Sequence, residues 1–432
     1  MPDSLLNVNI VTGPVIIAFF AVSAAALIYL LARRPTPRWI VTAAIGLLGG
    51  AVIGLATLLV TVGLLNLFGS PLSHEANAWI IAAFAAIGLA IVNLWRSRWW
   101  RKLIAVVGIL LFGITATLGV NAAYGLNPTL GSFLHINTSQ PIDPGKPPAT
   151  PPPANAGPLW ETWTPPADMP AAGKTGTVDI PATASGFSAR AAELYLPPAA
   201  QVDNAPALPF VLMMMGQPGD PDAQYIAAIL DKYAAANKGL APIALIVDQL
   251  GDPANDPLCL DSSRGNVETY VMTDAVGWAK ANLNILPDRT EWTVAGYSNG
   301  GECSAYFGSK YPDVWGNILD ISGDAYAGAE DSDQVLKEIF GGDQAAYDAV
   351  KPVNILAAGS YPDTTAIFTV GADDGTFQPD AKAVSDAAAA AGMNTTYYEV
   401  PGGDHGVSAL NGGLDKGFEL LYPRLGLSQP AS

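Results

Sequence analysis

The chain has 432 residues, of which 50% are hydrophobic and only 14% are charged, and its net charge is −17. Because soluble domains have about 25% charged residues, the low charged fraction indicates that part of the chain lies in lipid. The acidic balance argues against a nucleic-acid partner, which would need a basic surface.

The charge is divided unevenly along the chain. Residues 1–126 contain seven basic and two acidic residues, whereas the remaining 306 contain 14 basic and 36 acidic ones. The sequence therefore predicts an N-terminal membrane domain over residues 1–126 and a separate acidic domain over residues 159–432. The second part is long enough to bury a sizeable core.

Four long apolar runs without a charged residue lie in the first part, at residues 13–32, 39–68, 78–95 and 103–120. A helix of about 20 residues crosses a hydrocarbon layer of about 30 Å. We therefore expect four transmembrane helices that serve as an anchor. A transport or lipid-binding role is the alternative, and a protein partner for the helices stays open.

The cations of this part lie in two of its loops. They are Arg33, Arg34 and Arg38 between the first two runs, and Arg96, Arg98, Arg101 and Lys102 between the last two. By the positive-inside rule both loops are cytoplasmic. We therefore expect a multi-pass protein of the cell membrane whose N-terminus and whose residues after 120 lie outside.

Residues 127–158 form a predicted juxtamembrane segment and linker. The stretch 137–158 is rich in Pro and Ala and has no hydrophobic period. Such a composition is typical of an extended spacer that builds no core. The pattern predicts a domain boundary near Leu159.

After this boundary, short apolar strands alternate with amphipathic helices. We expect strands at 174–187, 190–196, 209–215, 242–247, 292–295, 316–321, 366–370 and 395–400, with helices at 223–237, 267–283, 302–311 and 381–391. The first two strands are predicted to form an antiparallel pair. The alternation predicts an α/β domain whose sheet is mostly parallel and covered on both faces, with its chemistry at the carboxyl ends of the strands.

The sequence Gly296-Tyr297-Ser298-Asn299-Gly300 follows an apolar strand and precedes a helical pattern. This context matches the nucleophile elbow, a tight strand-to-helix turn that exposes a serine. We expect the flanking glycines to be required because a Cβ there would collide with the neighbouring strand and helix. An incidental serine in a glycine-rich turn is the alternative.

A serine nucleophile needs a base, which is usually histidine. The chain has three histidines: His74 lies between apolar runs and His135 lies beside the predicted bilayer. His405 follows the last strand, which is the place of the base in the order Ser, Asp, His. We therefore expect His405 to be the catalytic base.

The acid is expected after the strand at 366–370, in the sequence Gly371-Ala372-Asp373-Asp374. The spacing from the glycine favours Asp374, whose role would be to orient the imidazole. Asp373 remains the competitor. Asp404, beside the histidine, is expected to cap its loop.

The developing oxyanion needs two backbone N–H donors. One is expected at Asn299, directly after the nucleophile, and the other in the loop at residues 216–219. Pro218 has no N–H, so Gln217 is the preferred second donor, with Gly216 as the alternative.

The motifs GYSNGG, GADD and GGDH resemble those of the esterase D-like family of α/β-hydrolases, which includes feruloyl esterases and actinobacterial mycolyltransferases. The resemblance covers roughly residues 174–425. It implies an ester hydrolase or acyltransferase of the α/β-hydrolase fold that works through an acyl-serine. Many relatives have a histidine where this chain has Met215.

Both cysteines, Cys259 and Cys303, lie in the predicted outer domain. An even count in an extracytoplasmic domain favours a disulfide, which would join the loop at 252–265 to the nucleophile helix. Two buried thiols are the alternative.

Arg264 lies in that same loop and could bind a substrate carboxylate or polar head; pairing with a neighbouring aspartate is the alternative. The sequence has no cluster with metal-ligand spacing and no phosphate-binding loop, so we expect neither a metal nor a cofactor.

These features predict a membrane-anchored, extracytoplasmic serine esterase or acyltransferase. Its substrate would be a carboxylic ester, such as a lipid or acyl sugar of the envelope. The alternative is a non-catalytic envelope scaffold that uses the hydrolase fold as a binding module.

Overall fold

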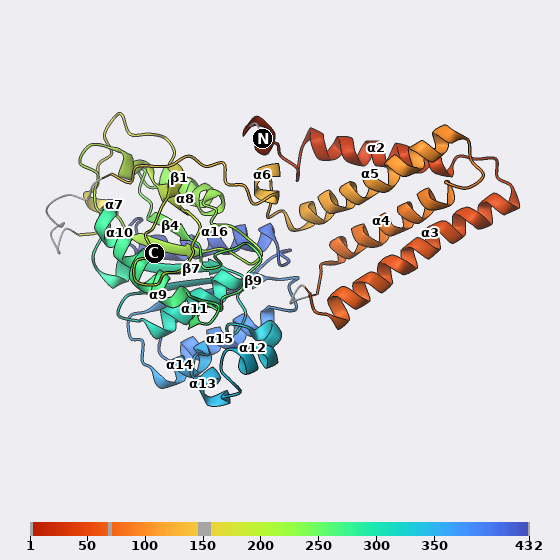
Figure 1. The fold of residues 1–432 in the computed structure, drawn as a ribbon. Helices are drawn as coiled ribbons and strands as arrows, with labels where there is room; N and C mark the ends of the chain where they lie inside the picture. Colours follow the sequence, from red (N-terminus) through yellow and green to blue (C-terminus); the bar gives the residue numbers. More distant parts are fainter. Residues whose placement is uncertain (1–2, 68–70, 146–156, 431–432) are drawn as a thin grey trace. The chain divides into compact units, whose positions relative to one another are not determined.

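The computed structural model describes residues 3–67, 71–145 and 157–430. The chain forms two compact units, residues 1–138 and residues 139–432, and both are labelled in Figure 1. Residues 146–156 of the predicted linker lie outside the described residues, and the boundary near Leu159 stays a prediction.

The named elements in the described part of the first unit are all helices. Its helices are α1 (Asp3–Leu6), α2 (Pro14–Leu31), α3 (Pro37–Leu58) continued by the π-helical turn η1 (Leu59–Leu64), α4 (His74–Val92), α5 (Trp99–Tyr124) and α6 (Leu130–Phe133). The four predicted long helices are present as α2, α3 with η1, α4 and α5. All four are long and apolar enough to span a membrane.

Glycines allow α3 and α4 to approach closely. A Cβ at Gly50 would lie 2.1 Å from the Phe84 carbonyl oxygen, and one at Gly88 would lie 2.0 Å from the Gly46 carbonyl oxygen. Small residues at such crossings are a common device for packing helices in lipid, where no hydrophobic effect drives association. This packing favours a specific helix bundle over four independent anchors.

Arg101 satisfies the C-terminal end of α2. Its Nη2 donates to the carbonyl oxygens of Tyr29 and Leu30, both at 2.6 Å, and its Nε donates to Asn93 Oδ1 at 2.8 Å. The last carbonyls of a helix have no partner within the helix, and Arg101 supplies one here. Because Arg101 lies in α5 and Asn93 caps α4, these hydrogen bonds link α2, α4 and α5.

The second unit is built on one sheet of eight strands among its described residues. In order across the sheet they are β1 (Lys174–Val178), β2 (Ala192–Leu196), β4 (Ile243–Val247), β3 (Phe210–Met214), β7 (Trp292–Tyr297), β8 (Asn317–Ile321), β9 (Thr365–Gly371) and β10 (Asn394–Val400). β2 is antiparallel to β1 and β4, and every other pairing is parallel. The mixed sheet with its helices confirms the predicted α/β-hydrolase type of fold.

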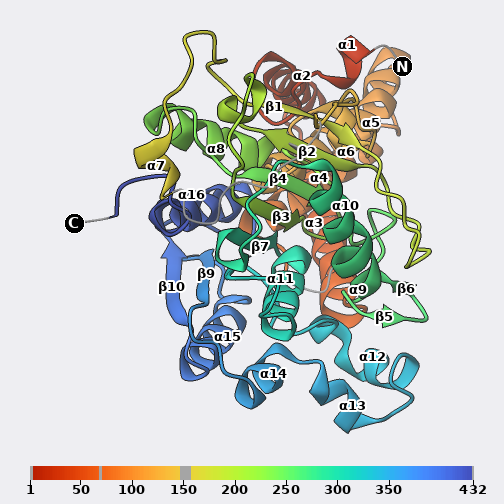
Figure 2. The same cartoon turned by 90° about the vertical axis from the view of Figure 1, so that its left-hand side faces the viewer.

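Helices cover both faces of this sheet (Figure 2). Two consecutive residues of β8 show it: Ile318 packs on Gly308 of α11 (Asn299–Lys310), whereas Leu319 packs on Gly417 of α16 (Val407–Arg424). Helix α8 (Gln224–Ala236) packs beside α16, and α15 (Gln378–Ala390) lies against β9 and β10. The parallel strands are buried along their whole length apart from β10, as expected for a doubly covered sheet.

Shorter elements complete the second unit. They are α7 (Leu159–Thr162), η2 (Pro198–Gln201), β5 (Asp261–Ser262), β6 (Gly265–Asn266), η4 (Arg289–Glu291), η5 (Ala329–Asp331), α12 (Ser332–Glu338), α13 (Gln344–Ala349) and α14 (Pro352–Ala358).

Two predicted elements differ from the structure. The first strand ends at Val178 rather than at 187, because Asp274 accepts the backbone N–H groups of Ala184 and Ser185 at 2.9 and 3.0 Å and holds them in a loop. The single helix expected at 267–283 consists of α9 (Val267–Thr269), the π-helical turn η3 (Tyr270–Ala275) and α10 (Val276–Asn282). Helix α16 was not predicted.

Candidate active site

Ser298 stands alone between the end of β7 and the start of α11, with φ of 55° and ψ of −120°. A positive φ is uncommon for a residue with a Cβ and is strained. Hydrogen bonds on both sides hold it: the Ser298 N–H donates to the Ile321 carbonyl at 2.8 Å, and the Gly301 N–H donates to the Ser298 carbonyl at 2.7 Å. The serine therefore lies in the sharp turn that the sequence predicts.

The glycines on either side of Ser298 leave no room for a side chain. A Cβ at Gly296 would lie 1.8 Å from the Gly300 carbonyl oxygen, and one at Gly300 would lie 2.1 Å from the Met214 carbonyl oxygen. Real Cβ atoms do not approach backbone so closely. The expected collision with strand and helix is therefore found at both positions.

A chain of hydrogen bonds joins three side chains that are distant in sequence. His405 Nε2 lies 2.9 Å from Ser298 Oγ, and His405 Nδ1 lies 2.7 Å from Asp374 Oδ2. With a proton on Nδ1 donated to the carboxylate, Nε2 is the acceptor for the serine hydroxyl. This is the arrangement of a Ser-His-Asp triad.

Aromatic rings fix the imidazole. The Phe377 ring stacks on His405 with centroids 3.8 Å apart, and the Tyr297 ring lies 5.5 Å away at an interplanar angle of 28°. The Asp374 side chain is only 5% exposed, whereas that of His405 is 23% exposed. The Asp374 carboxylate is thus shielded while the His405 imidazole stays partly open to solvent.

Asp373, the competitor, and Asp404, the expected loop cap, have other contacts. Asp373 is exposed, and its backbone N–H donates to the Gly403 carbonyl at 2.7 Å. Asp404 accepts the hydroxyl of Ser408, the second residue of α16, at 3.0 Å, and its expected role as a loop cap stays a prediction. The structure thus brings Asp374 to His405, and Asp374 is the acid that the sequence spacing favours over Asp373.

The loop after β3 lies against Ser298. A Cβ at Gly216 would be 3.2 Å from Ser298 Cβ, and Gln217 is exposed, with its side chain donating to the Ala254 carbonyl at 2.8 Å. Asn299 opens α11, where the first N–H groups have no partner within the helix. The two segments predicted to supply oxyanion donors are therefore adjacent, and the choice between Gln217 and Gly216 stays a prediction.

Cys259 and Cys303 form a disulfide, with Cα atoms 5.5 Å apart. The predicted bridge is thus confirmed. It fastens the long loop after β4 to the first turns of α11, the helix that follows Ser298.

A group of carboxylates that the sequence did not predict surrounds this bridge. Glu302 is 3% exposed, and Asn299 Nδ2 donates to Asp256 Oδ1 at 3.1 Å and to Glu302 Oε1 at 3.2 Å. Burial and the nearby carboxylates raise the pKa of Glu302 well above its usual range. Burial, reinforced by repulsion from Glu330, raises the pKa of Asp324 to about 8.

Two further candidates are Arg264, as a substrate-binding residue, and a group of possible metal ligands. Arg264 pairs with Glu338 at 3.5 Å and donates to the Asp256 carbonyl at 3.2 Å, so its predicted contact with substrate stays a prediction. In the described part of the chain, Cys259, Glu302 and Cys303 have metal-ligand atoms within 4.8 Å of one another. The disulfide removes both thiolates, so this group does not fit a metal.

The buried carboxylates make stability depend on pH. Asp324 and the buried Asp320, whose pKa burial raises to about 7, stabilise the fold fully only below the unfolded value of about 4. This contribution is lost as pH rises through about 7 to 8, because the native state then has to bury charged carboxylates. We expect the melting temperature, measured by calorimetry of the whole protein in detergent, to fall between about pH 5 and about pH 8.

Asp324→Asn should reduce this fall, whereas the exposed Asp386→Asn should leave it as in the wild type. A melting temperature that is constant or rises over this range would contradict the assignment.

Comparison with known proteins gives one relative in sequence and several in structure. The chain is 29% identical over 442 residues to an uncharacterised protein of Corynebacterium glutamicum, with 98% of each chain covered. No family model matches it. Among solved structures it is similar to a ferulic acid esterase (TM-score 0.49, 15% identity, 59% of this chain and 99% of the esterase). It is also similar to an S-formylglutathione hydrolase from Agrobacterium tumefaciens (TM-score 0.48, 16% identity, 60% of this chain and 98% of that chain).

Proposed function

We propose that this protein is a serine ester hydrolase or acyltransferase, and that Ser298, His405 and Asp374 are its catalytic triad. The observation that carries the proposal is the continuous hydrogen-bonded chain from Ser298 Oγ through the imidazole to the buried Asp374 carboxylate. A structural serine has no need of a strained turn, a base and an oriented acid together.

The proposed reaction begins when His405 Nε2 takes the proton of the Ser298 hydroxyl. The oxygen then attacks the ester carbonyl carbon, and the N–H groups of Asn299 and Gln217 stabilise the oxyanion of the tetrahedral intermediate. As the intermediate collapses, His405 returns the proton to the leaving alcohol, and the acyl group remains on Ser298.

The second half of the reaction releases the acyl group. His405 takes a proton from water or from a second hydroxyl, whose oxygen attacks the acyl-serine, and Ser298 recovers its proton as the new acid or ester leaves. Asp374 keeps the proton of the imidazole on Nδ1 and stabilises the imidazolium in each half. Hydrolysis and transfer use the same residues, so free acid and acylated sugar, measured with a sugar acceptor present, distinguish them.

The surroundings of the reaction follow from the charge distribution. The cations of the first unit lie in the segments at 33–38 and 96–102, which comprise two interhelical loops and the first turns of α3 and α5. This supports a cytoplasmic position for both segments. The catalytic unit would then face the extracytoplasmic side, where an ester of an envelope lipid or acyl sugar is a fitting substrate. No step requires a metal or cofactor.

The second candidate function is a non-catalytic scaffold with the same fold. A binding module needs neither the 2.9 Å contact of His405 with Ser298 nor the 2.7 Å contact with Asp374. The two candidates differ in whether Ser298 reacts.

We expect a fluorophosphonate probe to label the folded wild type in detergent and to fail on Ser298→Ala. The reagent phosphonylates a serine only when a base activates it. Ser408→Ala, another serine of the same region, serves as the control and should label as the wild type does. Equal labelling of wild type and Ser298→Ala would refute the proposal that Ser298 is the catalytic serine.

Asp374→Asn should lower kcat for p-nitrophenyl butyrate by about 10⁴-fold, as loss of the tautomer-fixing carboxylate does in other triads. Asp373→Asn should stay near wild type, because its side chain is exposed. The reverse pattern would make Asp373 the acid.

Orientation is tested with single added cysteines, since both native cysteines are bonded to each other. A membrane-impermeant maleimide should label Asp333→Cys in intact cells and should label Arg34→Cys only after lysis. Both positions are exposed and therefore open to the reagent. Labelling of Arg34→Cys but not of Asp333→Cys in intact cells would show that the topology is the opposite of the proposed one.

A further inference from the structure

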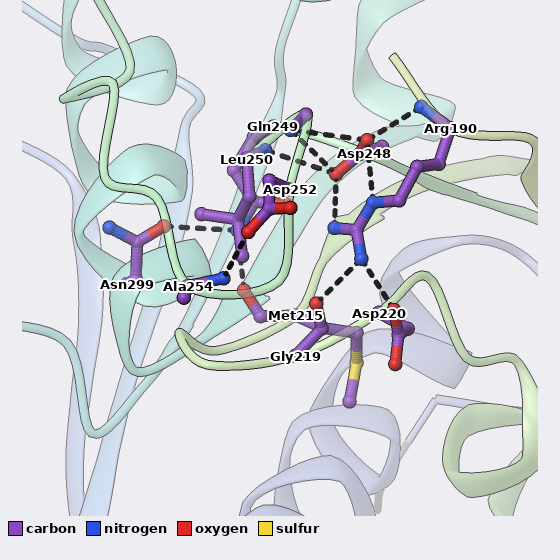
Figure 3. Close-up of polar contacts among 11 residues, drawn as sticks. Arg190, Met215, Gly219, Asp220, Asp248, Gln249, Leu250, Asp252, Ala254 and Asn299 are labelled. Atoms are coloured by element: carbon purple, nitrogen blue, oxygen red, sulfur yellow. Dashed lines mark hydrogen bonds and ion pairs between the residues drawn. The ribbon is translucent and has the colours of Figure 1, made fainter. Parts of the chain in front are cut away.

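Gln249 connects the two segments that carry the candidate oxyanion donors. It lies two residues beyond the end of β4 and is only 2% exposed. Its Nε2 donates to the Met215 carbonyl at 2.5 Å and to Asn299 Oδ1 at 3.0 Å. Figure 3 shows this amide between the loop after β3 and the start of α11.

The two oxygens that accept from Gln249, the Met215 carbonyl and Asn299 Oδ1, are both linked covalently to backbone near a candidate oxyanion donor. The Met215 carbonyl shares one planar peptide group with the Gly216 N–H, so fixing the oxygen also fixes that N–H and the start of the loop with Gln217. The Asn299 side chain belongs to the residue whose own N–H is the other expected donor. One buried amide group thus sets the spacing of the two segments.

The turn that carries Gln249 is itself held firmly. The Asp248 carboxylate accepts the N–H groups of Leu250 and Gly251, both at 3.1 Å, and Arg190 Nη2 at 2.6 Å. Arg190 Nη1 also donates to the Gly219 carbonyl at 3.0 Å, as Figure 3 shows. The loop after β3 is therefore fastened at Met215 by Gln249 and at Gly219 by Arg190.

The chemistry of the site requires an amide at position 249. Both partners of Nε2 are acceptors, and a primary amide supplies two N–H donors from one nitrogen. A glutamate of the same size supplies none when ionised and would face two oxygens. A methionine has a similar length and no donor.

We propose that Gln249 is a positioning residue that holds the two halves of the oxyanion hole in register. This inference rests on the proposed esterase function and deepens it. A misplaced donor weakens the stabilisation of charge that exists only in the transition state, so it lowers kcat more than it raises KM.

The test compares Gln249→Glu with wild type in the full-length protein in detergent, using p-nitrophenyl butyrate. We expect kcat to fall by about 10- to 100-fold, less than the 10²–10³-fold of a deleted donor, with KM changed by less than about threefold. Labelling by the fluorophosphonate should slow by a similar factor, because its phosphoryl oxygen occupies the same hole.

Asn317→Asp is the matched control. Asn317 is also fully buried, and its Nδ2 donates to the carbonyls of Thr290 and Trp292 at 2.8 and 3.1 Å, but it lies at the opposite end of the sheet. It should lose stability as Gln249→Glu does and keep its kcat. Where Gln249→Glu does not fold, Gln249→Asn, one methylene too short to reach both acceptors, takes its place.

A folded position-249 variant whose kcat stays within about twofold of wild type would overturn the inference, as would an equal fall in Asn317→Asp. Failure of the proposed function is recognised separately, because the wild type would then neither turn over the ester nor label at Ser298.

Discussion

The strained turn at Ser298 determines the geometry of the candidate site in the second unit. A residue with a side chain at a positive φ costs on the order of 1–3 kcal/mol, and the parallel sheet offsets that cost. The Ser298 N–H is bonded to β8, and glycines at 296 and 300 let strand, turn and helix pack without a collision. The hydroxyl is thereby presented at the carboxyl ends of the strands, where the loops after β9 and β10 bring Asp374 and His405.

The region around this turn is stiffened on several sides. The disulfide fastens the loop after β4 to α11, and Gln249 and Arg190 fasten the loop after β3. Stacking on Phe377 limits rotation of the His405 ring. Stabilisation of a transition state depends on donors that do not reorganise during the reaction, and these restraints act on the groups that would be the donors and the base.

Ser298, His405 and Asp374 could be selected from the sequence because each follows a recognisable strand, and the structure brings the three side chains together. Ser298 stands in a motif whose spacing fixes its place, and His405 and Asp374 follow the last two apolar strands. The order of elements along the chain then determined their meeting at one edge of the sheet. The four apolar helices were equally clear, since uncharged runs of that length are rare in soluble domains.

Other features depend on contacts that no local pattern records. Helix α16 was missed because Gly413, Gly417 and Pro423 disfavour a helix, although these glycines are needed against Thr369 and Leu319. Gln249 has no motif, and its importance arises only when β3, β4 and α11 lie together. Arg264 was selected from the sequence as a possible substrate-binding residue, whereas in the structure it pairs with Glu338.

In the proposed mechanism, Ser298 becomes acylated during each turnover. The full-length protein is mixed with p-nitrophenyl butyrate, quenched in acid within the first turnovers, digested and analysed by mass spectrometry. We expect a butyryl group on the peptide that contains Ser298. Turnover with an unmodified Ser298 peptide, or an acyl group on another residue, would contradict it.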